Sequence, residues 1–149
     1  MINCNKSDTK YHQAREHAKS LIDKRDTNIK KYVIILDIDD TIYDTKTDKL
    51  IEPIYDLYNY ALSQNIYTVF ITAREGSEYS KKFTVEQLNA LGIKGYDLLY
   101  LRPPSMKDVY KYKTYARKNV FESGYIPLFS IGDQKWDIGD YGGHGIHIK

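Results

Sequence analysis

Short apolar runs alternate along this chain with longer stretches in which apolar residues recur at helical spacing. The runs are typical of strands buried on both faces of a sheet, because apolar residues occupy consecutive positions in them. We expect strands at 32–37, 67–71, 97–101, 128–131 and 145–148. The helical spacing predicts helices at 8–25, 51–62, 77–91 and 105–122, the first of them amphipathic.

Proline and glycine positions agree with these boundaries. Pro53 falls in the first turn of the second predicted helix, where proline is tolerated, and Gly92 follows the third as a stop. Pro103 and Pro104 end the third strand, and residues 44–49 are polar and turn-like. Strands and helices that alternate through short connections predict an α/β fold with three α/β/α layers, Rossmann-like, around a mostly parallel five-stranded sheet.

Polar side chains follow the predicted strands at their carboxyl ends, where open α/β sheets place their active sites. The run Val33 to Leu36 continues directly into Asp37 and Asp39. Burying a carboxylate at a strand tip is costly unless a cation or hydrogen bonds compensate it. Two carboxylates that leave the tip on one side indicate a divalent-metal site or a pair of acid and nucleophile. The other polar residues at strand ends are Asp40, Thr41, Thr72, Arg74, Arg102, Asp133 and Asp137.

Composition narrows the class of protein. A chain of 149 residues fits one compact domain, so we expect a single domain over 1–149. The formal net charge of +2 is too small to indicate a nucleic-acid or membrane surface. With the single cysteine Cys4 no intrachain disulfide can form, which fits a reducing compartment. No apolar stretch reaches the roughly 20 residues that span a bilayer, and no signal-peptide core is seen, so a cytoplasmic location is expected.

Four segments, in chain order, resemble the motifs of the haloacid dehalogenase-like (HAD) phosphatase superfamily. They are Asp37-Ile38-Asp39-Asp40-Thr41, Thr72 within Ile-Thr-Ala-Arg, Lys113 within Tyr-Lys-Thr, and Gly132-Asp133-Gln134-Lys135-Trp136-Asp137. Together they frame residues 32–148. The Arg-Pro-Pro-Ser, Tyr-Lys-Thr and Gly-Asp-Gln segments look most like the class B and plant vegetative-storage acid phosphatase branch.

The resemblance implies a Mg²⁺-dependent phosphomonoester hydrolase. Asp37 would be the nucleophile that forms an aspartyl-phosphate, and Asp39 would be the general acid and then the base. Thr72 would hydrogen-bond the phosphoryl group, and Lys113 would neutralise its charge. The implied Mg²⁺ ligands are Asp37, the backbone carbonyl of Asp39, Asp133 and Asp137, the last directly or through water. The candidate substrate-binding residues are Thr41, Ala73 and Arg74.

These residue types suit the chemistry on physical grounds as well. A carboxylate cannot approach a phosphate dianion without cations nearby, which Mg²⁺ and Lys113 would supply. Mg²⁺ prefers hard oxygen ligands, in keeping with a site rich in aspartate. Partial burial would help Asp39 hold a proton near neutral pH.

Some choices remain open in the sequence. Asp40 stands where glycine is frequent in the superfamily, and Lys111 could replace Lys113 as the third-motif lysine, although the Tyr-Lys-Thr context favours Lys113. The short intervals between motifs leave no room for a large cap domain, so we expect an open site. The helix at 8–25 could shield that site or pack on the sheet.

The alternatives concern substrate and activity. A phosphorylated small molecule is the preferred substrate, and the runner-up is a nucleic-acid 3′-phosphatase that resembles the phosphatase half of polynucleotide kinase-phosphatases. A basic run on one predicted helix supports the runner-up weakly, since most such runs are solvated faces. Its members are Lys107, Lys111, Lys113, Arg117 and Lys118. Two other hypotheses remain. The chain could be a catalytically silent storage or binding relative, or it could be a receiver-like domain. The retained Asp37 argues against the former, and the order of the acidic residues against the latter.

Overall fold

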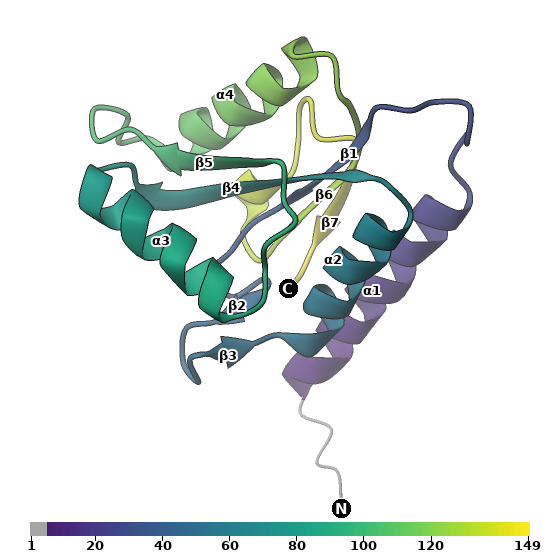
Figure 1. Ribbon diagram of the computed structural model, residues 1–149, viewed down its shortest axis with the longest axis horizontal. Helices are drawn as coiled ribbons and strands as arrows, with labels where there is room; N and C mark the ends of the chain where they lie inside the picture. The colour runs from purple at the N-terminus through teal and green to yellow at the C-terminus, as the bar shows by residue number, and fades with distance from the viewer. Residues whose placement is uncertain (1–5) are drawn as a thin grey trace, which may run out of the picture.

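The computed structural model describes residues 6–149, so Cys4 lies outside the described residues. Figure 1 shows a central sheet with helices on both sides. The helices are α1 (Lys6–Asp23), α2 (Glu52–Ser63), α3 (Glu78–Ala90) and α4 (Val109–Glu122). The strands of the main sheet are β1 (Tyr32–Leu36), β4 (Tyr67–Glu75), β5 (Leu98–Arg102), β6 (Ile126–Gly132) and β7 (His144–His147).

The five strands pair in the order β5-β4-β1-β6-β7, and every pair is parallel. Because β1 lies at the centre, the carboxyl ends of β4 and β6 lie on either side of its own end. The sheet is covered by helices on both faces, and no large cap domain interrupts the described chain. The three-layer α/β prediction is therefore confirmed.

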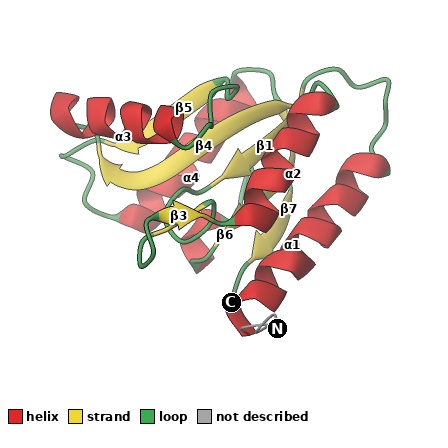
Figure 2. Ribbon diagram, turned by 60° about the horizontal axis from the view of Figure 1, so that its bottom comes forward, coloured by secondary structure: helices red, strands yellow, loops and turns green. Residues whose placement is uncertain are grey.

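The two faces of β1 pack against different helices, as the pleat of a strand requires. Ile34 and Leu36 join a core built with α1 and α2, whereas Val33 and Ile35 join a core built with α4. Figures 1 and 2 show α1 and α2 packed side by side on one face, with α4 across the sheet. No helix of the described residues has the length and apolar character needed to cross a membrane.

The structure departs from the predicted elements after β1. The turn-like stretch contains a small antiparallel hairpin of β2 (Tyr43–Asp44) and β3 (Lys49–Leu50), which the sequence did not reveal. Strands of two residues are too short for a hydrophobic period to develop. The hairpin instead depends on Asp40, whose carboxylate accepts hydrogen bonds from the amide (3.0 Å) and hydroxyl (2.8 Å) of Thr45.

The start of α4 also differs from the prediction. The helix begins at Val109 rather than near 105, because the side chain of Asp108 caps it by accepting a hydrogen bond from the Lys111 amide. The residues before it form a turn closed by the Met106 amide and the Pro103 carbonyl, 2.9 Å apart.

Candidate active site

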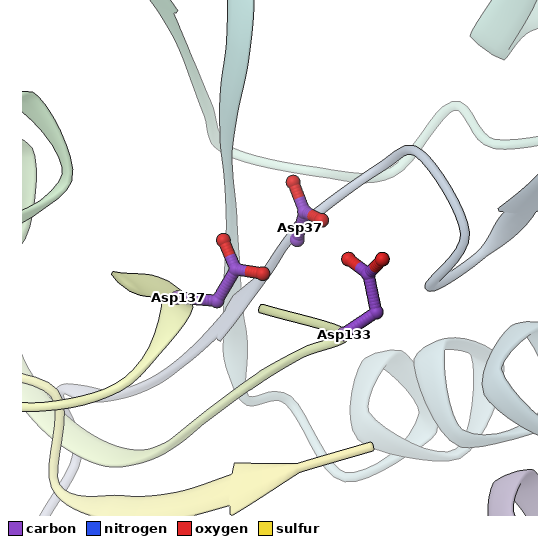
Figure 3. Close-up of side chains that lie close together, drawn as sticks. All are labelled: Asp37, Asp133 and Asp137. Carbon is purple, nitrogen blue, oxygen red and sulfur yellow. The ribbon is translucent and has the colours of Figure 1, made fainter. Parts of the chain in front are cut away.

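Three aspartates meet at the carboxyl edge of the sheet. Asp37 follows β1, Asp133 follows β6, and Asp137 belongs to the short 3₁₀ helix η1 (Lys135–Asp137). One carboxylate oxygen from each lies within 4.8 Å of the others (Figure 3). Gly132 permits this approach, since a Cβ atom there would lie 2.3 Å from the Asp137 side chain. The glycine of the fourth motif therefore lets Asp137 fold back over the end of β6.

Lys113 reaches this cluster from α4. Its Nζ lies 3.0 Å from Asp37 Oδ1 and 2.7 Å from Asp137 Oδ1, and donates to the Ile71 carbonyl at 2.6 Å. Lys113 is 1% exposed, whereas Lys111 is exposed on the helix surface. Of the two candidate lysines, the structure brings only Lys113 to the aspartates.

The cluster holds more negative charge than Lys113 can balance. Burial raises the pKa of Asp37 to about 8, even though the Lys113 ammonium acts to lower it. Burial also raises the pKa of Asp133. For Lys113, burial acts to lower the pKa, but the carboxylates of Asp37 and Asp137 outweigh it and the net shift is upward. A further cation would relieve this imbalance.

An unpartnered oxygen atom shows where such a cation would bind. Asp133 Oδ1 is buried without a hydrogen-bond partner among the described residues, whereas the buried Asp137 Oδ1 lies 2.7 Å from the Lys113 ammonium. Buried polar atoms are rarely left in this state. Hard carboxylate oxygens that converge in this way fit a divalent cation such as Mg²⁺, with Asp37, Asp133 and Asp137 as its side-chain ligands.

Asp39 points to a different partner. Both of its carboxylate oxygens accept hydrogen bonds from Arg74, from Nε at 3.0 Å and from Nη2 at 2.7 Å. Arg74 Nη1 also donates to the Thr84 hydroxyl at 3.2 Å. The Asp39 side chain is 37% exposed, and its carboxylate forms an ion pair with Arg74. Partial burial of Asp39 was expected from the sequence, whereas this ion pair was not. A role for Arg74 in substrate binding would require this pair to open.

The remaining predicted site residues hold the strand ends in place. The Thr41 hydroxyl donates to Asp37 Oδ2 at 3.3 Å, and the buried Thr72 hydroxyl accepts from the Arg74 amide at 3.1 Å. The Ala73 carbonyl accepts from Arg102 Nε at 3.0 Å. Arg102 also donates to the Met106 carbonyl, so it braces the loop after β5 as its neighbouring prolines suggested.

One cation was misread from the sequence. Arg117, assigned to a solvated basic face, is 1% exposed and lies beneath the loop that carries Asp137. The signal was available, because Arg117 follows Lys113 by four residues and shares the buried stripe of α4 with Tyr112, Ala116 and Val120. The basic run is therefore not a single exposed face.

A cleft of about 820 Å³ opens beside Asp133. It lies between α1, the β2–β3 hairpin and the start of α2, and Asp133 is the member of the acidic cluster that lines it, so α1 borders a space beside the cluster as well as packing on the sheet. The Tyr11 hydroxyl ties α1 to the hairpin by donating to the Asp40 carbonyl at 2.7 Å. Residues lining the cleft include Lys10, Tyr11, His12, Lys46, Leu50 and Asp133.

Comparison with known proteins agrees with this geometry. The family model of the HAD superfamily, subfamily IIIB (acid phosphatase), matches residues 42–148. The chain belongs to this subfamily. The matched region contains Thr72, Lys113, Asp133 and Asp137, whereas Asp37 lies just before it. Membership confirms the resemblance to the acid phosphatase branch of the HAD superfamily.

A solved structure shares the fold. The class C acid phosphatase from Bacillus anthracis aligns with a TM-score of 0.70 and 18% sequence identity, over 91% of this chain. The chain covers 66% of that structure's length, so the relative contains further residues without a counterpart here. No curated protein matches the chain by sequence.

Proposed function

We propose that this HAD-type chain is a Mg²⁺-dependent phosphomonoester hydrolase that acts through an aspartyl-phosphate on Asp37. One observation carries the proposal: a buried carboxylate at the central strand end, held by Lys113 and Thr41, adjoins the carboxylates of Asp133 and Asp137, and Asp133 Oδ1 is buried without a partner among the described residues. These groups meet at the carboxyl edge of the sheet, Lys113 from α4 and the others from the segments after β1 and β6. Bound Mg²⁺ would offset the charge between the carboxylates and the phosphoryl group.

Asp37 is positioned to act as the nucleophile. An oxygen of its carboxylate attacks phosphorus, a bond from Asp37 to phosphorus forms, and the ester oxygen leaves with the bonding electrons. Lys113, 3.0 Å from Asp37 Oδ1, keeps a positive charge beside the oxygens on which charge develops. Water then attacks the same phosphorus, and inorganic phosphate leaves while the Asp37 carboxylate is regenerated.

Asp39 would move the protons in both steps. It would give a proton to the departing ester oxygen and later take one from the attacking water. In the free protein both Asp39 oxygens are occupied by Arg74. A phosphoryl oxygen is an alternative anion for the Arg74 guanidinium, so substrate binding would release at least one Asp39 oxygen for this work.

The cleft favours a small phosphorylated substrate over a polynucleotide. Its volume is within the range of ordinary small-molecule sites. Acidic residues line it alongside the basic ones, which disfavours a polyanion: the acids are Asp40, Asp44, Glu52, Asp56 and Asp133, and the bases Lys10, Arg15 and Lys46. Burial of Lys113 and Arg117 also removes two members of the basic run that could have tracked a nucleic-acid backbone.

Hydrolysis of p-nitrophenyl phosphate tests the proposed activity. We expect turnover by the wild type with Mg²⁺, none with excess EDTA, and a loss of about 10³-fold or more in Asp37→Asn. Asp108→Asn is the matched control, because asparagine caps a helix as well as aspartate and Asp108 lies at the exposed start of α4. Turnover by Asp37→Asn at the wild-type rate would rule out the mechanism.

Salt dependence distinguishes the two substrate classes. With a 3′-phosphorylated oligonucleotide, several phosphate contacts would make affinity fall steeply as salt rises. We expect instead that a small phosphomonoester is the better substrate and that its KM changes little with salt. A steep salt dependence together with a preference for the oligonucleotide would support the runner-up.

A further inference from the structure

Helix α4 places a second buried cation beneath the site, four residues after Lys113. Arg117 is 1% exposed, and its guanidinium donates to three oxygen atoms. Nη1 donates to the Trp136 carbonyl at 2.8 Å, Nε to the Asp140 carbonyl at 2.9 Å, and Nη2 to the Thr114 hydroxyl at 3.3 Å. Two of the three acceptors therefore belong to the loop that carries Asp137.

The Trp136 carbonyl is part of the peptide group that leads into Asp137. The amide of the same peptide group donates to the Gln134 carbonyl at 3.0 Å, so both of its polar ends are held. The Asp137 side chain is held separately, by the Gln134 amide at Oδ2 and by Lys113 near Oδ1. Arg117 thus fixes the backbone from which the Asp137 carboxylate reaches toward Asp37.

Burying a guanidinium in a protein interior is energetically unfavourable unless its charge is compensated. Burying a charge costs several kcal/mol unless hydrogen bonds compensate it, and an apolar side chain would pack at less cost. Among the described residues no carboxylate accepts a hydrogen bond from Arg117, so the side chain is not half of an ordinary buried ion pair. Its planar fork instead spans two carbonyls of the loop.

The loop between those two carbonyls lacks regular structure of its own. Gly139, between them, has a φ of +131°, and Tyr141, just after them, a φ of +66°, and no helix or strand is formed from the end of η1 to the start of β7. Gly142 packs against Arg117, since a Cβ atom there would lie 3.0 Å from Arg117 Cδ. The loop is folded around this side chain.

We infer that Arg117 is a positioning residue that presets Asp137 for binding a divalent cation. The inference rests on the proposed function, in which Asp137 is a ligand of Mg²⁺. Residues that orient metal ligands typically alter metal affinity by about 10- to 100-fold when they are replaced. Arg117 belongs to this group by its contacts, although it touches neither the cation site nor the substrate cleft.

Trp136 provides a direct readout, because it is the single tryptophan of the chain and lies in the loop itself. We would measure acrylamide quenching of its fluorescence without metal, and Mg²⁺ binding by calorimetry, in Arg117→Met and Arg117→Lys. Arg25→Met is the matched control. Arg25 also donates to two backbone carbonyls, those of Ile22 and Gln64, at the ends of α1 and α2 away from the acidic cluster.

We expect Arg117→Met to bind Mg²⁺ about 10- to 100-fold more weakly than wild type, with greater quenching of Trp136. Arg117→Lys keeps the charge but cannot span both carbonyls. Its Mg²⁺ affinity and its Trp136 quenching should therefore lie between those of wild type and those of Arg117→Met. Arg25→Met should lose thermal stability yet keep wild-type Mg²⁺ affinity and quenching. If Arg117→Met does not fold, Arg117→Lys is judged by the same two measurements.

Two results would overturn the inference: wild-type Mg²⁺ affinity in the Arg117 variants, or equal weakening in Arg25→Met. A wild-type protein that binds no Mg²⁺ would instead contradict the proposed function. The positional claim would then be judged by quenching alone, and unchanged quenching in the Arg117 variants would overturn it.

Discussion

Individual residues around Asp37 show how a buried carboxylate is held at the end of the central strand. Thr41 and Lys113 each hold one of its oxygens, while Asp133 and Asp137 add negative charge that no described side chain fully balances. A group in this position is stabilised when it is protonated or when a metal ion is bound. Its titration and its cation partners can therefore be tested one at a time.

Asp37 should make the metal-free protein less stable as pH rises. Its folded-state pKa of about 8 lies above its ordinary value of 3.8, so the folded protein holds a proton that the unfolded chain has released. The contribution of this proton to stability is complete below the unfolded pKa and is lost as pH rises through the folded one. We expect the free energy of unfolding in EDTA to fall between about pH 5 and 8, relative to Asp37→Asn. A difference between the two proteins that is independent of pH would contradict the raised pKa.

Lys113 and Lys111 offer a matched pair on one helix. Replacing Lys113 by Met leaves two buried carboxylates without their countercharge, which should cost about 3–5 kcal/mol of stability in the metal-free protein near pH 8. Lys111→Met alters an exposed side chain and should change stability by less than about 0.5 kcal/mol. Urea unfolding measures both. Equal effects of the two substitutions would mean that Lys113 does not compensate the cluster.

Among the elements, helix α4 and the β2–β3 hairpin shape the surroundings of the acidic cluster. Helix α4 brings Lys113 and Arg117 to it, and the β2–β3 hairpin lines the cleft beside Asp133. Asp40, in the turn that precedes the hairpin, has a φ of +58°, which is in the left-handed region. That conformation explains why glycine is frequent at this point of the superfamily motif, and the Thr45 hydrogen bonds explain how aspartate is accommodated.

Substitutions at Asp40 should separate these two effects. Asp40→Ala keeps the backbone strain and loses the hydrogen bonds to Thr45, so it should destabilise the protein by about 1–2 kcal/mol. Asp40→Gly loses the same bonds but relieves the strain, and should cost less. Urea unfolding of both variants checks the order, and a glycine variant less stable than the alanine variant would contradict it.

The sheet and the acidic cluster were predictable because their signals are local. Consecutive apolar residues mark β1, and Asp37 and Asp133 each directly follow a predicted strand, where open α/β sheets gather polar residues. That β1 and β6 are neighbours in the sheet was seen only in the structure. The hairpin was not predictable, since its strands are two residues long and depend on side-chain bonds from Asp40.

Side-chain pairing between elements was the harder part of the site. The contact of Arg74 with Asp39 depends on how two side chains at the ends of different strands are oriented. The spacing of residues along the sequence does not indicate such orientations. Arg117 looked like a solvated cation because a charge at a buried position is uncommon. Only its place on the same stripe as Tyr112 and Ala116 distinguished it.

At the scale of the whole molecule, cation binding and folding should be coupled. Asp37 is distant in the sequence from Asp133 and Asp137, so the site exists only in the folded chain. A ligand that binds the folded state alone at 100 times its Kd adds about 2.7 kcal/mol of stability. We expect Mg²⁺ to raise the melting temperature of wild type near pH 8, relative to EDTA, and to have no such effect on Asp133→Asn. Asp108→Asn should keep the full Mg²⁺ shift, and a shift that persisted in Asp133→Asn would move the cation elsewhere.

The most direct test of the account is chemical identification of the phosphorylated residue. The protein would be quenched in acid during turnover with Mg²⁺ and treated with borohydride, which reduces an aspartyl-phosphate to homoserine, and its peptides would be sequenced by mass spectrometry. We predict homoserine at position 37 in the presence of substrate and Mg²⁺, and none in the presence of EDTA. Steady turnover without modification of Asp37, or modification at another residue, would contradict the central claim.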